Sequence, residues 1–318
     1  MNRQIAVAIG ACALAAAIPG AGAAEARLKA AAFLPVRSVY VQQFARFTAE
    51  VNQRCNGKVA ISTVGPEAIK SLEQWNALKS GVVDMHYGPA NYYVGAVPEG
   101  DVISVARKET AEQRRNGAWQ LINEVHNQKL NAWYLTHLMN GVRFHIYTSK
   151  PAQGASFDDF RLRSTPIYDT FFKSLGALPV RMAPPEVYTG LERGTVDGYG
   201  WPLWGIADFG WQKYTKYRYG PGFISAAVAI LVNLDKWKSL DDGQRQCLTD
   251  VAMWAEAQWP KWRAAENGAQ QEVQDKSGIK YVDLGPGFAQ KAEDLYWEML
   301  EKGNPEFVRK VRPLLSGK

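Results

Sequence analysis

Residues 186–197 read EVYTGLERGTVD, and residues 73–84 read EQWNALKSGVVD. Both segments follow a strand-like run and a proline-containing turn, and their apolar residues recur at helical spacing. Gly194 and Gly81 stand where a helix ends in the left-handed conformation that other residues resist. A second strand is expected after each segment. We interpret the two segments as one β-α-β unit used twice, which predicts two similar α/β lobes rather than one long sheet.

The two units continue into Tyr87-Gly88-Pro89 and Gly200-Trp201-Pro202. Ligands of open α/β sheets bind beyond the carboxyl ends of the strands. We therefore expect both stretches to be loops in equivalent positions, facing each other across a cleft between the lobes.

Two arginines lie at strand-like segments of the second half. Residues 160–163 predict a strand, and Thr165 followed by Pro166 predicts a helix start, with Thr as the cap and Pro in the first turn. Arg163 then combines a guanidinium with free backbone N–H groups, which suits an anion. Arg143 lies on a strand expected over 141–147. For either arginine taken alone, a solvent-exposed charge at a strand end is the alternative interpretation.

Two longer patterns bear on how the lobes are joined. The apolar run 223–232 is too short to cross a membrane and predicts one buried strand. Residues 240–275 predict one long helix, or two helices with a kink at Pro260. A helix of that length exceeds one lobe and is expected to brace both.

Residues 1–23 have the order of a secretory signal peptide: a basic residue, an apolar stretch and a small-residue ending. We expect cleavage near Ala23 and export to the periplasm. A lipid-attachment box at Cys12 is the weaker alternative, because few apolar residues precede it. The remaining cysteines, Cys55 and Cys247, are equally consistent with one disulfide and with two buried thiols.

The composition excludes several classes of function. The chain has 318 residues and a net charge of +6, with its basic residues scattered, which argues against nucleic-acid binding. The common hydrolase, metalloprotease and nucleotide-binding motifs are absent, and the four histidines lack metal-ligand spacing. We therefore expect no catalytic residue, metal or cofactor, and a binding protein rather than an enzyme.

Residues 160–202, FRLRSTP…LGALPVRMAPPEVYTGLERGTVDGYGWP, carry a family resemblance. The chain resembles the periplasmic solute receptors of tripartite ATP-independent periplasmic (TRAP) transporters, the DctP-like dicarboxylate-receptor family. The resemblance implies a two-lobed periplasmic-binding-protein-like α/β fold, with a ligand cleft between the lobes and a long helix behind both. It also implies that Arg163 binds the ligand carboxylate and that Arg143 adds a second contact. Where many members have Glu this chain has Gly200, so we expect no metal-bridged ligand.

From these observations we expect a receptor that binds a small organic acid and delivers it, as a monomer, to the small and large membrane subunits of a TRAP transporter. A monocarboxylate with an apolar or aromatic part is favoured, because aromatic residues surround the expected site. A dicarboxylate, a sensor-kinase partner and a secreted enzyme acting on a carboxylic acid are the alternatives. The expected ligand-binding residues are Arg163, Arg143, Trp201, Tyr87, Gly88, Asn91, Tyr92 and Tyr168. We expect lobe I to comprise residues 24–140 and 229–268, and lobe II to comprise residues 141–228 and 269–318.

Overall fold

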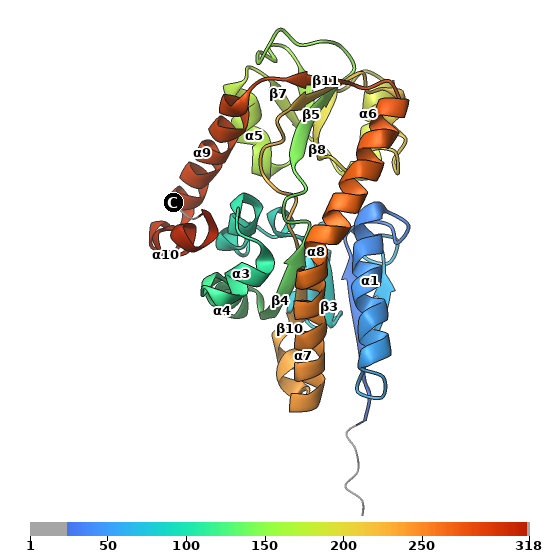
Figure 1. Ribbon diagram of the computed structural model, residues 1–318, viewed down its shortest axis with the longest axis vertical. Helices are drawn as coiled ribbons and strands as arrows, with labels where there is room; N and C mark the ends of the chain where they lie inside the picture. Colours follow the sequence, from blue (N-terminus) through green and yellow to red (C-terminus); the bar gives the residue numbers. More distant parts are fainter. Residues whose placement is uncertain (1–23, 317–318) are drawn as a thin grey trace, which may run out of the picture.

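The computed structural model describes residues 24–316 and contains two β-sheets, one in each half of an elongated molecule (Figure 1). The predicted signal peptide and its cleavage near Ala23 lie outside the described residues. No helix among the residues described is both long enough and apolar enough to cross a membrane.

The first sheet has the strand order β2-β1-β3-β10-β4. β1 pairs in parallel with β2 and β3, and β10 runs antiparallel between β3 and β4. The strands are β1 (Ala26–Ala32), β2 (Val59–Val64), β3 (Met85–Pro89), β4 (Ala132–Leu138) and β10 (Val228–Asn233). The helices of this half are α1 (Val39–Arg54), α2 (Gln74–Lys79), η1 (Ala90–Tyr92), η2 (Pro98–Val105), α3 (Thr110–Arg115), α4 (Ala118–Leu130) and α7 (Leu234–Ser239).

The second sheet has the order β11-β9-β5-β8-β6-β7, with β8 parallel to β6 and antiparallel to β5. Its strands are β5 (Phe144–Thr148), β6 (Arg161–Ser164), β7 (Leu178–Arg181), β8 (Gly198–Pro202), β9 (Tyr217–Gly220) and β11 (Lys280–Asp283). The helices that follow or cover it are α5 (Pro166–Ser174), α6 (Pro184–Glu192), η3 (Trp211–Lys213) and α9 (Pro286–Gly303), and α9 is followed by α10 (Pro305–Ser316). The predicted α/β fold with two lobes is confirmed.

The repeated unit is present in both lobes. α2 and α6 are each followed by a glycine at positive φ, Gly81 at 75° and Gly194 at 64°. The prediction that residues 87–89 and 200–202 form loops is wrong, because they are the last residues of β3 and β8. Backbone pairing with neighbouring strands extends to Pro89 and Pro202. The two stretches still occupy equivalent positions, at the ends of equivalent strands.

The apolar run 223–232 is not one strand, which corrects the sequence prediction. Only its second part belongs to β10, whereas Phe223 pairs with Phe144, the first residue of β5, and Ser225 pairs with Arg143 just before it. Two segments therefore run side by side between the sheets, one leading from β4 to β5 and the other from β9 to β10. Apart from Ser225 the run is apolar, because it is buried both in β10 and in the crossing between the lobes.

The long helix α8 (Asp242–Lys276) continues through Pro260 and is the third connection between the lobes (Figure 1). Its first half packs on α1, α3, β2 and β4. There Glu256 accepts hydrogen bonds from Arg114 and from Thr136. In its second half, Asn267 and Gln270 bond the chain beyond β8. The expected bracing of both lobes by one helix is confirmed.

The lobe boundaries expected from the sequence remain a prediction. Within the segment 269–318 assigned to lobe II, α9 contacts α5 of that lobe and also η2 of lobe I. α10 contacts η2 and α4, which belong to lobe I. The end of the chain therefore crosses back to the first lobe.

Cys55 and Cys247 form a disulfide, with their Cα atoms 5.9 Å apart. The bond joins the end of α1 to the first half of α8. The sequence was consistent with either a disulfide or two free thiols, and the structure shows the disulfide. Such a bond persists in an oxidising compartment such as the periplasm.

All four histidines are buried, and burial lowers the pKa of each below its ordinary value. The pKa falls to about 3 for His86, His137 and His145, and to about 4 for His126. The folded protein therefore keeps these rings neutral. In the unfolded chain they take up protons near pH 6.5, so acid favours unfolding.

We predict that the free energy of unfolding is highest above pH 6.5 and falls as the pH is lowered toward 4. Each buried histidine contributes a slope of about 1.4 kcal/mol per pH unit. Burial raises the pKa of Asp101 to about 7, so this carboxyl group stabilises the folded protein at lower pH and offsets part of the histidine effect. Urea unfolding at several pH values measures how the free energy of unfolding depends on pH. His86→Met should make that dependence shallower. A stability that does not change between pH 7 and 5 would contradict this prediction.

Candidate functional site

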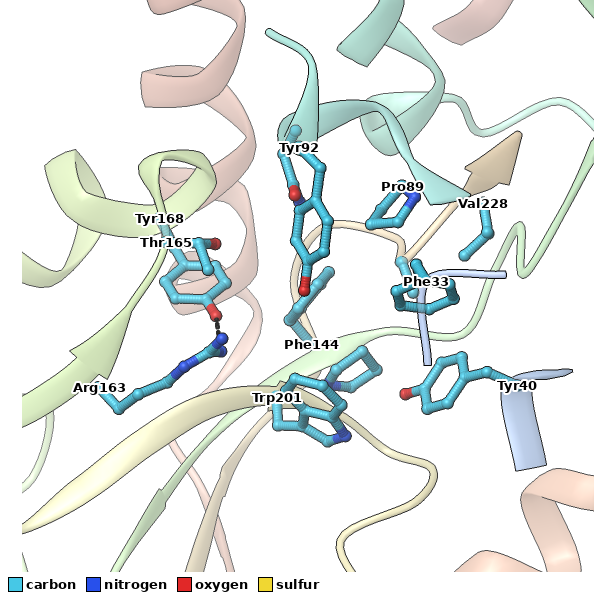
Figure 2. A pocket seen from close by; sticks show the side chains of 13 residues that line it. Phe33, Tyr40, Pro89, Tyr92, Phe144, Arg163, Thr165, Tyr168, Trp201 and Val228 are labelled. Carbon is cyan, nitrogen blue, oxygen red and sulfur yellow. Dashed lines mark hydrogen bonds between the residues drawn. The ribbon is translucent and has the colours of Figure 1, made fainter. Parts of the chain in front are cut away.

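A cavity lies between the two sheets, at the ends of β3, β6 and β8 (Figure 2). Its atom-free space is about 370 Å³, of which the centre of a water molecule can occupy about 30 Å³. The lining residues come from both lobes and are Phe33, Tyr40, Pro89, Asn91, Tyr92, Phe144, Arg163, Thr165, Tyr168, Trp201, Pro202, Ala226 and Val228. The space is small and mostly apolar.

Arg163 is the only cation among the described lining residues, and its side chain is 1% exposed. Nε donates to the carbonyl oxygen of Met182 at 2.9 Å, and Nη1 donates to Tyr168 Oη at 2.8 Å. A longer contact of 3.4 Å joins Nη1 to the carbonyl oxygen of Gly200. Within residues 24–316 no carboxylate forms an ion pair with this guanidinium. Its three partners are all neutral.

Trp201 and Tyr168 hold the guanidinium in place. Its central carbon lies 5.4 Å from the centroid of the Trp201 ring, at a distance typical of a cation–π contact. The Trp201 ring is fixed by a 2.8 Å hydrogen bond from its Nε1 to the carbonyl oxygen of Trp204. Tyr168 Oη donates to the carbonyl oxygen of Gly200 at 3.0 Å while accepting from Arg163. Figure 2 shows Tyr168 directly against the arginine.

Gly200 permits the close packing behind Arg163. A Cβ atom at this position would lie 2.7 Å from Phe172 Cζ and 2.9 Å from Tyr168 Cε2. Any side chain at this position would therefore displace the tyrosine that supports the guanidinium. The described residues also contain no cluster of three or more His, Cys, Asp or Glu side chains that could hold a metal ion.

Three polar atoms of the cavity lining are buried without a hydrogen-bond partner from residues 24–316: Arg163 Nη2, Thr165 Oγ1 and Asn91 Oδ1. Thr165 is the N-cap residue of α5, but its side chain does not cap the helix, which corrects the sequence prediction. Its hydroxyl is instead a lining group of the cavity. Leaving buried polar atoms unpaired costs about 1–3 kcal/mol each.

Tyr92 adds a fourth polar group, and Figure 2 shows its ring between Tyr168 and Pro89. Burial raises the pKa of Tyr92 to about 12, and nearby Arg163 offsets part of that increase. Burial likewise raises the pKa of Tyr168, against the effect of Arg163. Both phenols are therefore neutral at physiological pH and can donate hydrogen bonds.

Five of the eight residues predicted from the sequence line this cavity: Asn91, Tyr92, Arg163, Tyr168 and Trp201. Tyr87 does not, because its ring stacks on Phe44 and its hydroxyl donates to the Tyr40 carbonyl oxygen. Gly88 lies beside it on β3, where a Cβ atom would be 2.4 Å from the ring of His86.

Arg143 is also not brought to the cavity. Its guanidinium donates to the carbonyl oxygen of Phe223, on the neighbouring segment that crosses between the lobes. The strand expected over 141–147 begins only at Phe144, and Arg143 forms an isolated bridge with Ser225. The position of Arg143 supports a role at the crossing between the lobes rather than at the cavity.

Sequence reasoning missed most of the apolar wall. The missed lining residues are Phe33, Tyr40, Pro89, Phe144, Thr165, Pro202, Ala226 and Val228. Pro89 and Pro202 end the two repeated units, and this equivalence was the signal available for them. Phe33 and Val228 belong to fully buried runs, in which the sequence pattern does not mark the side that faces a ligand.

Contacts between the lobes flank the cavity. Tyr40, in α1 of the first lobe, donates from Oη to the carbonyl oxygen of Trp204 at 3.0 Å. The backbone N–H of Val39 donates to Asp208 Oδ2 at 2.8 Å. Asp208 thereby places a carboxylate at the N-terminus of α1, where the helix dipole favours negative charge. Burial raises the pKa of Asp208, and the hydrogen bond from Val39 opposes that increase.

A buried cavity between two α/β lobes, whose described lining contains one cation, defines a two-lobed solute-binding protein. The family described as "Bacterial extracellular solute-binding protein, family 7" (DctP) matches residues 30–303. The chain belongs to this family of TRAP-transporter solute receptors.

Individual relatives are distant. A solute-binding protein of Verminephrobacter eiseniae is 25% identical over 217 residues, which cover 65% of this chain and 64% of that relative. A TRAP periplasmic solute-binding protein of Pseudomonas putida F1, solved with D-glucuronate, has a TM-score of 0.77 at 18% identity, over 90% of this chain and 96% of that chain. DctP7 of Bordetella pertussis, which binds pyroglutamic acid, has a TM-score of 0.78 at 18% identity. The match covers 91% of this chain and 99% of DctP7. These structures share the fold.

We predict that Asp208→Ala makes the lobes separate more readily, because it removes the carboxylate that bonds the N-terminus of α1 across the lobe boundary. A contact of this kind is worth roughly 1 kcal/mol, or about fivefold in the balance between closed and open forms. Small-angle X-ray scattering of the unliganded protein should show a larger radius of gyration.

The matched control is Asp242→Ala, which removes a carboxylate that is 99% exposed and pairs only with Arg245 of its own helix. Equal scattering curves for Asp208→Ala and Asp242→Ala would refute a role for Asp208 in closure.

Proposed function

We propose that this protein is an extracytoplasmic receptor that binds a small organic acid and delivers it to a TRAP-type secondary transporter. The observation that carries the proposal is Arg163, a fully buried cation with neutral partners only. A buried charge without a counter-ion is strongly unfavourable unless a ligand supplies the opposite charge. A carboxylate in the cavity would do so.

The polar groups around Arg163 fit one carboxylate. Arg163 Nη2 and Thr165 Oγ1 are both buried and available, and each can donate to a carboxylate oxygen. Thr165 begins α5, so the positive end of that helix dipole also favours an anion there. These groups support a charge-assisted pair of hydrogen bonds to the ligand.

The lining favours a monocarboxylate with an apolar part. A second carboxylate would need a second cation, and the described lining residues contain only Arg163. The walls opposite Arg163 are made of Phe33, Phe144 and Val228, which offer no hydrogen bonds. A dicarboxylate is therefore the less favoured ligand.

The family and the sequence support the rest of the proposal. Relatives of this chain are solute-binding proteins, and the solved TRAP receptors similar to it are periplasmic proteins. We infer that residues 1–23 direct export, with cleavage near Ala23, and that the receptor acts as a monomer on the small and large membrane subunits. Delivery to a sensor kinase is the alternative use of the same fold, and neighbouring genes for the two membrane subunits would decide between them.

We predict that Arg163→Lys reduces the affinity for a carboxylate by about tenfold to a hundredfold. Lysine cannot keep the bonds to Met182 and Tyr168 while donating to the ligand, and a charged hydrogen bond contributes about 1.5–3 kcal/mol. A thermal-shift screen of mono- and dicarboxylates identifies a ligand, and calorimetry then measures its affinity.

The matched control is Arg181→Lys, on the neighbouring strand β7, whose side chain is 70% exposed and pairs with Asp169. It should leave affinity unchanged. Arg163→Met should abolish binding while the unliganded protein keeps or gains thermal stability, because an uncompensated buried charge is removed. Affinity retained in Arg163→Lys would overturn the assignment of Arg163.

We further predict that the protein returns its ligand chemically intact. The cavity lining contains no carboxylate, histidine or cysteine to transfer protons or attack a substrate. Prolonged incubation of the bound acid with stoichiometric protein, followed by mass spectrometry, tests this expectation. Conversion that continues beyond one equivalent would favour the enzyme alternative.

A further inference from the structure

Asn91 is a polar residue that lobe I contributes to the cavity, beside Tyr92 of the same turn. It lies in the single turn η1, directly after Pro89 at the end of β3. The residue is 9% exposed, and its Oδ1 atom is buried without a hydrogen-bond partner from residues 24–316. An amide in such a place is destabilising by about 1–3 kcal/mol unless something pairs with it.

The protein around the cavity does not satisfy this amide. Of the other lining side chains, Phe33, Pro89 and Val228 carry no hydrogen-bond donor. Thr165 Oγ1 is itself unpartnered, so it does not bond Asn91. No hydrogen bond to Asn91 Oδ1 comes from Arg163, Tyr92 or any other described lining residue, so its donor is expected from the cavity contents.

We propose that Asn91 is a specificity-determining residue that accepts a hydrogen bond from the 2-hydroxyl group of a small 2-hydroxymonocarboxylate. This inference rests on the proposed function, in which Arg163 and Thr165 bind the carboxylate. The centre of a water molecule can occupy only about 30 Å³ of the cavity, which favours a ligand whose hydroxyl lies next to its carboxylate. A short alkyl group would then face Phe144 and Val228.

The charge and donor requirements exclude two related classes of acid. A 2-oxo acid has no proton to donate to an acceptor oxygen. A 2-ammonium group can donate, but it would place a second positive charge beside Arg163 in a cavity whose described lining contains no carboxylate. Of these three substituents, only the hydroxyl group supplies a donor without charge.

Four acids of equal chain length test the inference: 2-hydroxybutanoate, butanoate, 2-oxobutanoate and 2-aminobutanoate. Calorimetry with the full mature protein should show that 2-hydroxybutanoate binds about fivefold to tenfold more tightly than each of the other three. Asn91→Leu, which is close in size and apolar, should reduce that preference over butanoate to less than about twofold.

The matched control is Asn127→Leu, which removes an asparagine of α4 that does not line the cavity. If Asn91→Leu does not fold, Asn91→Ala tests the same loss with a smaller side chain. An unchanged preference for 2-hydroxybutanoate in the folded variant, or no binding of 2-hydroxybutanoate at millimolar concentration, overturns the role assigned to Asn91. Arg163→Lys tests the receptor proposal separately, because it should weaken the binding of every acid whatever the effect of Asn91→Leu.

Discussion

A buried guanidinium with neutral partners is the constraint on which the site depends. Arg163 is held by a carbonyl oxygen of Met182, the hydroxyl of Tyr168 and the face of Trp201. These groups fix its direction without neutralising its charge. The same low-dielectric surroundings that make the unpaired charge unfavourable strengthen its attraction to an anion. The unfavourable free energy of burying the unpaired guanidinium is therefore offset when an anion binds to it.

The surrounding fold keeps that geometry rigid. Arg163 and Gly200 lie on the adjacent strands β6 and β8, and Tyr168 lies in the helix that follows β6. Because Gly200 has no side chain, the tyrosine ring can pack directly on β8. The bulk of the wall is aromatic, so few water molecules compete for the guanidinium. Residues of β6, α5 and the neighbouring strand β8 thus hold the guanidinium in place and keep water away from it.

The sequence predicted the parts of this arrangement that leave local patterns. The repeated unit with Gly81 and Gly194 predicted the two lobes, and the strand end before Pro166 predicted the position of Arg163. The sequence did not predict that Arg143 turns away from the cavity, because its carbonyl partner lies eighty residues further along the chain. Local alternation assigns a residue to a face but does not reveal which distant segment covers that face.

The same reasoning explains the error over residues 223–232. A uniformly apolar run predicts a buried strand, yet burial also occurs where a segment leaves one sheet, crosses between the lobes and enters another. The capping role expected of Thr165 failed for a related reason. A hydroxyl at a helix start is available either to the helix or to the space in front of it, and the choice depends on tertiary surroundings. In this protein that space is the cavity.

The division of polar groups between the lobes connects binding to closure. Arg163 and Thr165 belong to the second lobe, and Asn91 belongs to the first. A solute that bonds only one side binds the open and closed forms equally and does not change their balance. A solute that pairs with both favours closure by the bonds it makes only there, about 1 kcal/mol for each neutral one. The hydrogen bond from Val39 to Asp208 joins the two lobes without a solute. On the proposed receptor function, a few additional bonds from a small molecule would then be enough to shift an equilibrium between open and closed forms.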